Sequence, residues 1–122
     1  FRTNSFDVVT SAFLMRNVVS LRLALKEQYR VLTEGGCLLC LDTSPFQKTW
    51  LRPILNLYFF GVIPLLGQLI SGHGAAYKYF SESTAGFLPA EDLAQLITSV
   101  GFRNVGFSHA MLGSIAFHWG IK

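Results

Sequence analysis

The sequence predicts an α/β protein built around a buried parallel sheet, and three observations carry that prediction. Residues 6–13 and 37–41 are largely apolar runs without a regular alternation, as in strands that are buried on both faces. Between them, apolar residues recur at helical spacing over 21–32, with Ser20 as a candidate N-cap. The glycine pair at 35–36 is expected to end that helix. A strand, a helix and a strand with short connections form a βαβ unit, whose crossover is right-handed.

The end of the chain predicts one more helix and two more strands. Apolar residues repeat at helical spacing over 93–100, after Pro89 and before Gly101, which is expected to cap the helix. Residues 102–110 and 114–121 have the character of strands joined by a short turn. Their close spacing predicts an antiparallel hairpin.

The composition is that of one small, strongly apolar domain. Of 122 residues, 51% are hydrophobic and 14% are charged, which excludes a disordered chain. Eleven phenylalanines indicate a large core, or an apolar surface kept for a partner, lipid or ligand. The chain begins with Phe1 and shows no signal-peptide pattern, so we expect it to be a fragment of a longer protein.

Charge and cysteine placement exclude two classes of site. The net charge is +3, and the basic residues are scattered and form no stripe. Nucleic acid is therefore not expected as a partner, and weak attraction to anionic lipid is an alternative. Cys37 and Cys40 stand three apart within a predicted strand and therefore point to opposite faces. They cannot bind one metal ion together, and we expect two reduced thiols that pack as small apolar groups.

The longest apolar stretch, residues 50–70, does not have the pattern of a membrane span. Arg52, Pro53, Asn56 and Pro64 interrupt it, whereas a transmembrane helix needs about 20 apolar residues in sequence. We expect one or two short helices that form a lid over an apolar pocket or dip into a membrane surface.

Three motifs together resemble a known family. They are FDVVTSAFLMRNV at 6–18, YRVLTEGGCLLCLD at 29–42 and AAYKYFSESTAGFLPAEDLAQLITSVGF at 75–102. In this order they resemble the ubiquinone/menaquinone-biosynthesis C-methyltransferases, which are class I S-adenosylmethionine-dependent methyltransferases. The resemblance implies the C-terminal half of a Rossmann-like seven-stranded sheet, with strands four to seven, the helices between them and an apolar helical lid. Residues 1–122 would be a partial domain that lacks the Gly-rich cofactor-binding half, with a lid insertion at 46–87.

The same resemblance implies a function. S-adenosylmethionine would be the cofactor and a prenylated quinol the substrate, methylated at a ring carbon. The enzyme would be cytoplasmic and would contact the inner membrane peripherally. Formation of a homodimer is an open alternative. The fragment alone would be inactive. Two alternatives stand beside this reading: a non-catalytic α/β fragment, and a methyltransferase of the same fold for another apolar acceptor such as a sterol or a small phenol.

Candidate site residues cluster where the first strand ends. Arg16 either acts on the acceptor, by stabilising a developing phenolate or orienting a water, or pairs with a carboxylate to hold the loop. Asn17 either touches the cofactor or caps the following helix. The resemblance places Phe13 and Met15 beside the cofactor, although ordinary core packing is an alternative for both. Ala12 stands where the family usually has serine, so cofactor contact there would use backbone or packing.

Aromatic residues of the third motif are the candidate substrate contacts. The resemblance implies that Tyr77 and Tyr79 cover the quinol, and the alternative is that they are lid aromatics without a catalytic role. His109 and His118 fall in the predicted hairpin, where packing against the sheet is expected.

Overall fold

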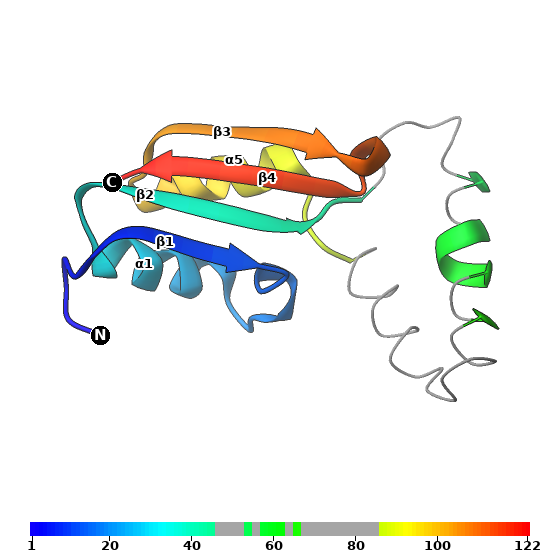
Figure 1. Ribbon diagram of the computed structural model, residues 1–122, viewed down its shortest axis with the longest axis horizontal. Helices are drawn as coiled ribbons and strands as arrows, with labels where there is room; N and C mark the ends of the chain where they lie inside the picture. The colour runs from blue at the N-terminus through cyan, green and yellow to red at the C-terminus, as the bar shows by residue number, and fades with distance from the viewer. Residues whose placement is uncertain (46–52, 55–56, 63–64, 67–85) are drawn as a thin grey trace.

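A computed structural model describes residues 1–45, 53–54, 57–62, 65–66 and 86–122. Within these ranges four strands form one sheet in the order β1-β2-β4-β3 (Figure 1). The strands are β1 (Phe6–Ala12), β2 (Leu32–Thr43), β3 (Arg103–Ala110) and β4 (Ile115–Ile121). β1 and β2 are parallel, and β4 is antiparallel to both of its neighbours, so the predicted terminal hairpin is confirmed.

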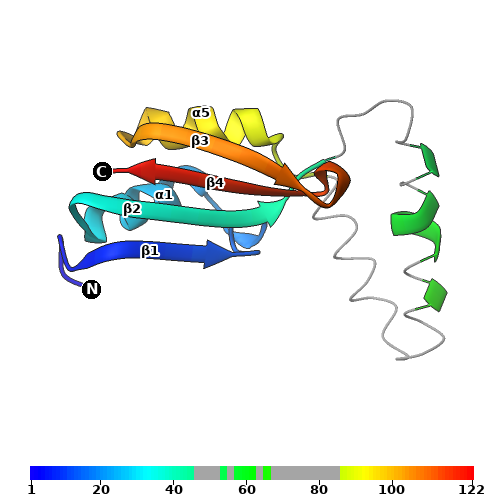
Figure 2. The same ribbon diagram turned by 45° about the horizontal axis from the view of Figure 1, so that its top comes forward.

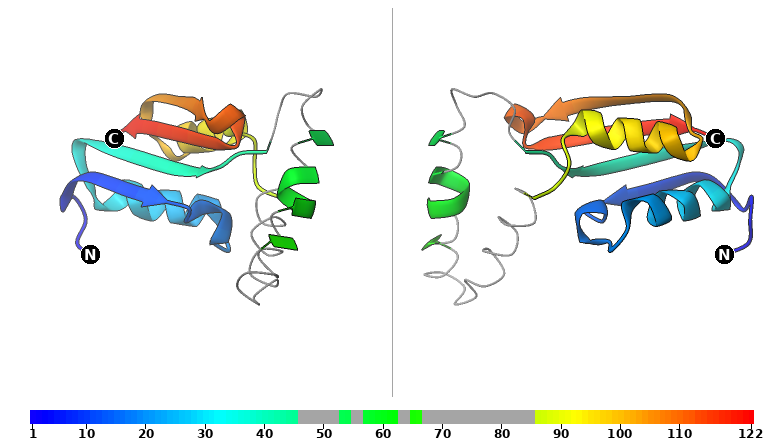
Figure 3. Two further views of the ribbon diagram at one scale, coloured as in Figure 1. Left: turned by 45° about the vertical axis from the view of Figure 1, so that its right-hand side comes forward. Right: turned by 180° about the vertical axis from the view of Figure 1, so that it is seen from behind.

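Two helices cover one face of this sheet. α1 (Leu21–Val31) connects β1 to β2, and α5 (Ala90–Val100) precedes the hairpin; both lie on the same side (Figures 2 and 3). Short turns complete the described fold: η1 (Met15–Asn17), the π-helical η2 (Leu57–Val62) and η3 (Met111–Gly113). The core lies between these two helices and the sheet, and its buried members are Met15, Leu25, Leu32, Leu38, Cys40, Leu93, Ile97 and Phe102.

The opposite face of the sheet, here called the outer face, carries no helix within the described ranges. Val8, Leu39 and Trp119 point to it and are 52%, 45% and 39% exposed. The prediction that residues 6–13 are buried on both faces is therefore wrong for this chain. Only one face is covered, and β1 is an edge strand with a single neighbour among the described strands.

The predicted end of the first helix is also wrong. α1 ends at Val31, and the glycine pair lies inside β2. Gly35 has a φ of +77°, which glycine adopts at little cost, and the register between β1 and β2 shifts in this region. A Cβ on Gly36 would lie 2.8 Å from the Thr33 carbonyl oxygen. The pair therefore serves an irregular turn within the strand and not a helix cap.

Other local signals are confirmed. The Ser20 hydroxyl accepts a hydrogen bond from the Leu23 backbone N–H at 3.4 Å, as an N-cap does. Gly101 ends α5 with a φ of +124°. Cys37 and Cys40 are both free thiols, and they lie on opposite faces of β2, with Cys40 buried.

Most of the predicted lid at 46–87 falls outside the described residues. The described part includes η2, which lies beyond the ends of β1, β2 and β3 (Figure 1). Its Leu57 and Tyr58 are exposed, as are Ile54, Leu65 and Leu66 nearby in sequence. No helix in the described part of the chain is long and apolar enough to cross a membrane.

Candidate active site at the carboxyl ends of the strands

The parallel strands β1 and β2 end at the same edge of the sheet. Ala12 pairs with Leu41, and the Phe13 backbone N–H donates to the Leu41 carbonyl oxygen at 2.8 Å, which extends the pairing by one residue. Open α/β sheets bind their ligands at this edge. The site predicted from the sequence is therefore at a place where this fold class binds ligands.

A strained turn follows β1. Phe13 has a φ of +53°, a left-handed conformation that costs a bulky residue about 1–3 kcal/mol unless its surroundings fix it. The Asn17 side-chain amide donates to the Phe13 carbonyl oxygen at 2.9 Å and so closes the turn. The prediction that Asn17 caps the next helix is wrong, because Ser20 caps α1. We call residues 13–17 the strand-end turn.

Arg16 forms a buried ion pair with Asp42. The Arg16 Nη1 lies 2.9 Å from Asp42 Oδ1, and the two side chains are 10% and 1% exposed. The Arg16 backbone N–H also donates to Asp42 Oδ2 at 3.2 Å. Of the two roles considered for Arg16, pairing with a carboxylate is therefore observed. The Arg16 guanidinium carbon also lies 5.1 Å from the centroid of the Phe13 ring, within cation–π range.

The other residues predicted for this site divide into three groups. Ala12 and Phe13 are exposed at the strand end, with Phe13 at 40%. Met15 is fully buried in the core, which agrees with the packing alternative. Tyr77 and Tyr79 lie outside the described residues.

Sequence reasoning missed Asp42, which the structure places at the centre of the site. The residue follows the apolar run of the second strand directly, just as Arg16 follows the first. Because parallel strands bring their carboxyl ends together, a carboxylate in that position was a usable signal. Its burial and its three hydrogen bonds could be learned only from the structure.

His118 lies on the covered face close to this end of the sheet, paired with Cys40 across β2 and β4. Its Nε2 lies 2.9 Å from the Ala90 carbonyl oxygen, which accepts the ring N–H. Burial lowers the pKa of His118, and the bond to Ala90 opposes that effect. Burial also raises the pKa of the Cys40 thiol. Both groups are therefore held neutral at pH 7, and neither carries charge into the site.

Chemically, the strand-end turn offers a rigid cation beside an exposed aromatic ring. A guanidinium in that place can stabilise a negative charge that develops on a bound ligand. The site therefore holds a guanidinium, paired with Asp42, beside an exposed aromatic ring at the ligand-binding edge of the sheet.

The described fold is similar to that of solved S-adenosylmethionine-dependent methyltransferases. A methyltransferase of Thermotoga maritima matches with a TM-score of 0.64 and 21% identity, over 99% of this chain and 58% of its own. Phosphoethanolamine N-methyltransferase 2 of Haemonchus contortus matches with a TM-score of 0.67 and 12% identity, over 100% of this chain and 34% of its own. At these identities the likeness establishes the fold alone.

The chain belongs to the ubiE/COQ5 methyltransferase family, whose model matches residues 1–122. The ubiquinone/menaquinone biosynthesis C-methyltransferase UbiE of Desulfotalea psychrophila is 46% identical over the whole chain, which covers 50% of that protein. The mitochondrial 2-methoxy-6-polyprenyl-1,4-benzoquinol methylase of Gallus gallus is 43% identical, with 39% of it covered. The chain therefore spans half or less of the length of these two relatives.

Proposed function

We propose that this chain is the acceptor-side part of an S-adenosylmethionine-dependent C-methyltransferase that acts on a prenylated quinol in ubiquinone or menaquinone biosynthesis. The observation that carries the proposal is the Arg16–Asp42 pair at the strand ends of a chain in the ubiE/COQ5 family. The names of the relatives, a quinone-biosynthesis C-methyltransferase and a polyprenyl-benzoquinol methylase, support the substrate class.

The chemistry of this transfer suits the residues at the strand end. S-adenosylmethionine, when bound, would supply a methyl group that a ring carbon attacks in line, while the bond from that methyl group to the sulfur breaks and the thioether leaves. Ala12 and Phe13 are exposed there and offer a backbone edge and an apolar ring to one side of such a cofactor. The ring carbon becomes more nucleophilic as the neighbouring hydroxyl loses its proton. Arg16 then stabilises the phenolate charge, and an acceptor for the proton comes from elsewhere in the site.

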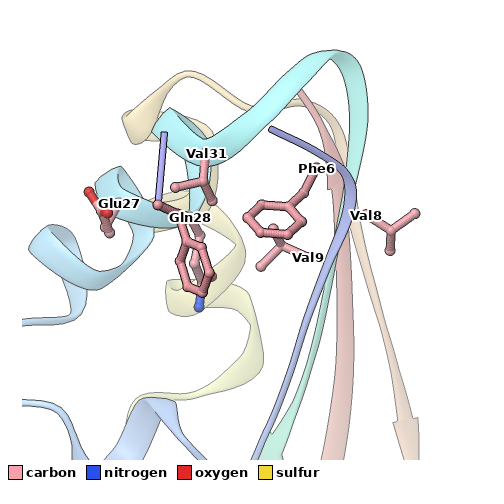
Figure 4. Close-up of a pocket in the computed structure, with 7 residues that line it drawn as sticks. Phe6, Val8, Val9, Glu27, Gln28 and Val31 are labelled. Atoms are coloured by element: carbon pink, nitrogen blue, oxygen red, sulfur yellow. The ribbon is translucent and has the colours of Figure 1, made fainter. Parts of the chain in front are cut away.

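The cofactor-binding part of the domain is proposed to lie against β1 and the outer face. β1 has an unpaired edge among the described strands, and the outer face exposes large apolar side chains such as Val8, Leu39 and Trp119, which are costly to leave in water. Beside the same edge, a pocket of about 330 Å³ opens between β1 and α1, lined mainly by Phe6, Val9 and Val31 (Figure 4). The length that the relatives have beyond this chain is enough for a second half-domain.

The segment 46–87 is proposed to form a lid over the acceptor, with Tyr77 and Tyr79 against the quinol ring and peripheral contact with the membrane that holds the prenyl tail. The exposed apolar side chains of η2 support this. Leu57→Asp, introduced into the full-length enzyme, should lower activity on a long-tailed quinol far more than on a short-tailed analogue. Equal losses on both substrates would count against tail binding.

Cofactor binding tests the proposal. We define the fusion protein as the half of the Desulfotalea psychrophila relative that this chain does not match, joined in frame to residues 1–122. Isothermal calorimetry should show that the fusion protein binds S-adenosylmethionine and that the 122-residue chain alone binds it far more weakly. A folded fusion protein without measurable affinity would contradict the proposal.

A further inference from the structure

Asp42 holds Arg16, which lies in η1 just after the neighbouring strand β1, through two separate hydrogen bonds. Its Oδ1 accepts from Arg16 Nη1 at 2.9 Å, and its Oδ2 accepts from the Arg16 backbone N–H at 3.2 Å. Oδ1 also accepts from the Thr43 backbone N–H at 2.8 Å, which ties the carboxylate to the end of its own strand. A single side chain thus clamps both the main chain and the guanidinium of Arg16.

Because position 42 is buried, the contact with Arg16 requires a carboxylate there. Asp42 is 1% exposed, and a buried charge is tolerated only when it is paired and hydrogen-bonded. A planar guanidinium and a carboxylate meet in a defined geometry, which fixes direction as well as distance. Asp42 in β2 therefore helps to set the orientation of Arg16, together with the contact to the Phe13 ring.

The strand-end turn depends on the same clamp. Phe13 holds a left-handed φ that persists only where the surroundings over-determine it. Several hydrogen bonds restrain the turn, among them the Asn17 amide on the Phe13 carbonyl oxygen and Asp42 on the Arg16 backbone. If the bond to Asp42 were lost, the turn would relax, and the Phe13 ring and the guanidinium would move together.

We propose that Asp42 is a positioning residue for methyl transfer, because it holds Arg16 and the strand-end turn in the geometry that the reaction needs. This inference rests on the proposed function. Asp42 itself is buried under the turn, so it acts through Arg16 and does not touch the acceptor.

The test uses matched variants of the fusion protein. Asp42→Asn keeps the shape and removes the charge, and Asp42→Glu keeps the charge. Glu34→Gln is the control, since Glu34 is exposed and lies near the start of β2, at the other end of that strand from Asp42. We expect Asp42→Asn to lower kcat about 100-fold, as a misplacement of about 1 Å can, with little change in the KM for the acceptor. Asp42→Glu should recover part of the loss, and the control should have normal kcat.

A second measurement does not depend on activity. In the 122-residue chain, NMR hydrogen exchange should show that Asp42→Asn speeds exchange at the Arg16 backbone N–H while the Leu38 N–H stays protected. Arg16→Lys tests the same link from the other side and should lower kcat comparably, with little added loss in the double variant. The inference is overturned if Asp42→Asn leaves both kcat and the Arg16 exchange rate unchanged. An unsubstituted fusion protein without activity would instead contradict the proposed function, and the exchange measurement would still decide the clamp.

Discussion

Leu38 and Leu39 provide a matched pair that tests whether the sheet is covered on one face only. The two are neighbours in β2 and point to opposite faces, with Leu38 fully buried and Leu39 45% exposed. Replacing a fully buried leucine with alanine costs about 2–5 kcal/mol, from lost transfer energy and the remaining cavity. Complete burial of a leucine contributes about 1.5–3 kcal/mol to stability. Leu39 is only partly covered, so Leu39→Ala should lower the free energy of unfolding by about 1 kcal/mol.

The assay is urea unfolding of the 122-residue chain, followed by circular dichroism. Leu38→Ala should lower the free energy of unfolding by several kcal/mol, and Leu39→Ala by much less. In the fusion protein, where a second half-domain is proposed to cover the outer face, the cost of Leu39→Ala should rise toward that of Leu38→Ala. Equal costs in the chain alone would refute the one-sided sheet, and they would point to a second copy covering the outer face.

Two further predictions concern the hairpin. Gly106→Ala should destabilise the chain by about 1–3 kcal/mol and shift the Trp119 fluorescence, because the new Cβ would lie 2.5 Å from the indole ring; urea unfolding and emission spectra measure both effects. An unchanged midpoint and spectrum would contradict that packing. His118 has a lowered pKa in the folded chain, so the unfolded chain binds its proton first as the pH falls. The free energy of unfolding should therefore fall as the pH drops from about 6.5 to the pKa of His118 in the folded chain. His118→Gln should remove most of this pH dependence. The same slope in both proteins would assign it to another group.

Local signals in the sequence predicted the elements well. The order of strand, helix and strand, the Ser20 cap, the Gly101 stop and the terminal hairpin all follow from contacts between residues close in sequence. The end of α1 was misplaced because a glycine pair serves equally well in a helix cap and in a strand irregularity. The choice between them depends on how Gly35 and its neighbours pair across the sheet.

The coverage of the sheet could not be derived from its pattern. A largely apolar run at residues 6–13 predicts two buried faces, yet β1 has one face open within the described chain. The apolar pattern of a strand reflects the surfaces that it packs against in the complete protein. Its side chains are buried only where those surfaces are present. The mismatch between the two supports the proposal that another half-domain packs here.

The candidate site was half predictable for a related reason. Arg16 could be chosen because it follows a strand at the ligand-binding edge. Its partner is 26 positions away in sequence, and the parallel register of β1 and β2 brings the two together. The left-handed φ of Phe13 could not be predicted from the sequence, because phenylalanine rarely adopts that conformation.

Methyl transfer by the fusion protein tests the central claim most directly. The reaction would contain labelled S-adenosylmethionine and a demethylated prenyl quinol, and the product would be identified by mass spectrometry. The proposed function predicts one added methyl group on a ring carbon, with far less product from the 122-residue chain alone. A folded fusion protein that binds the cofactor and leaves the quinol unmethylated would contradict it.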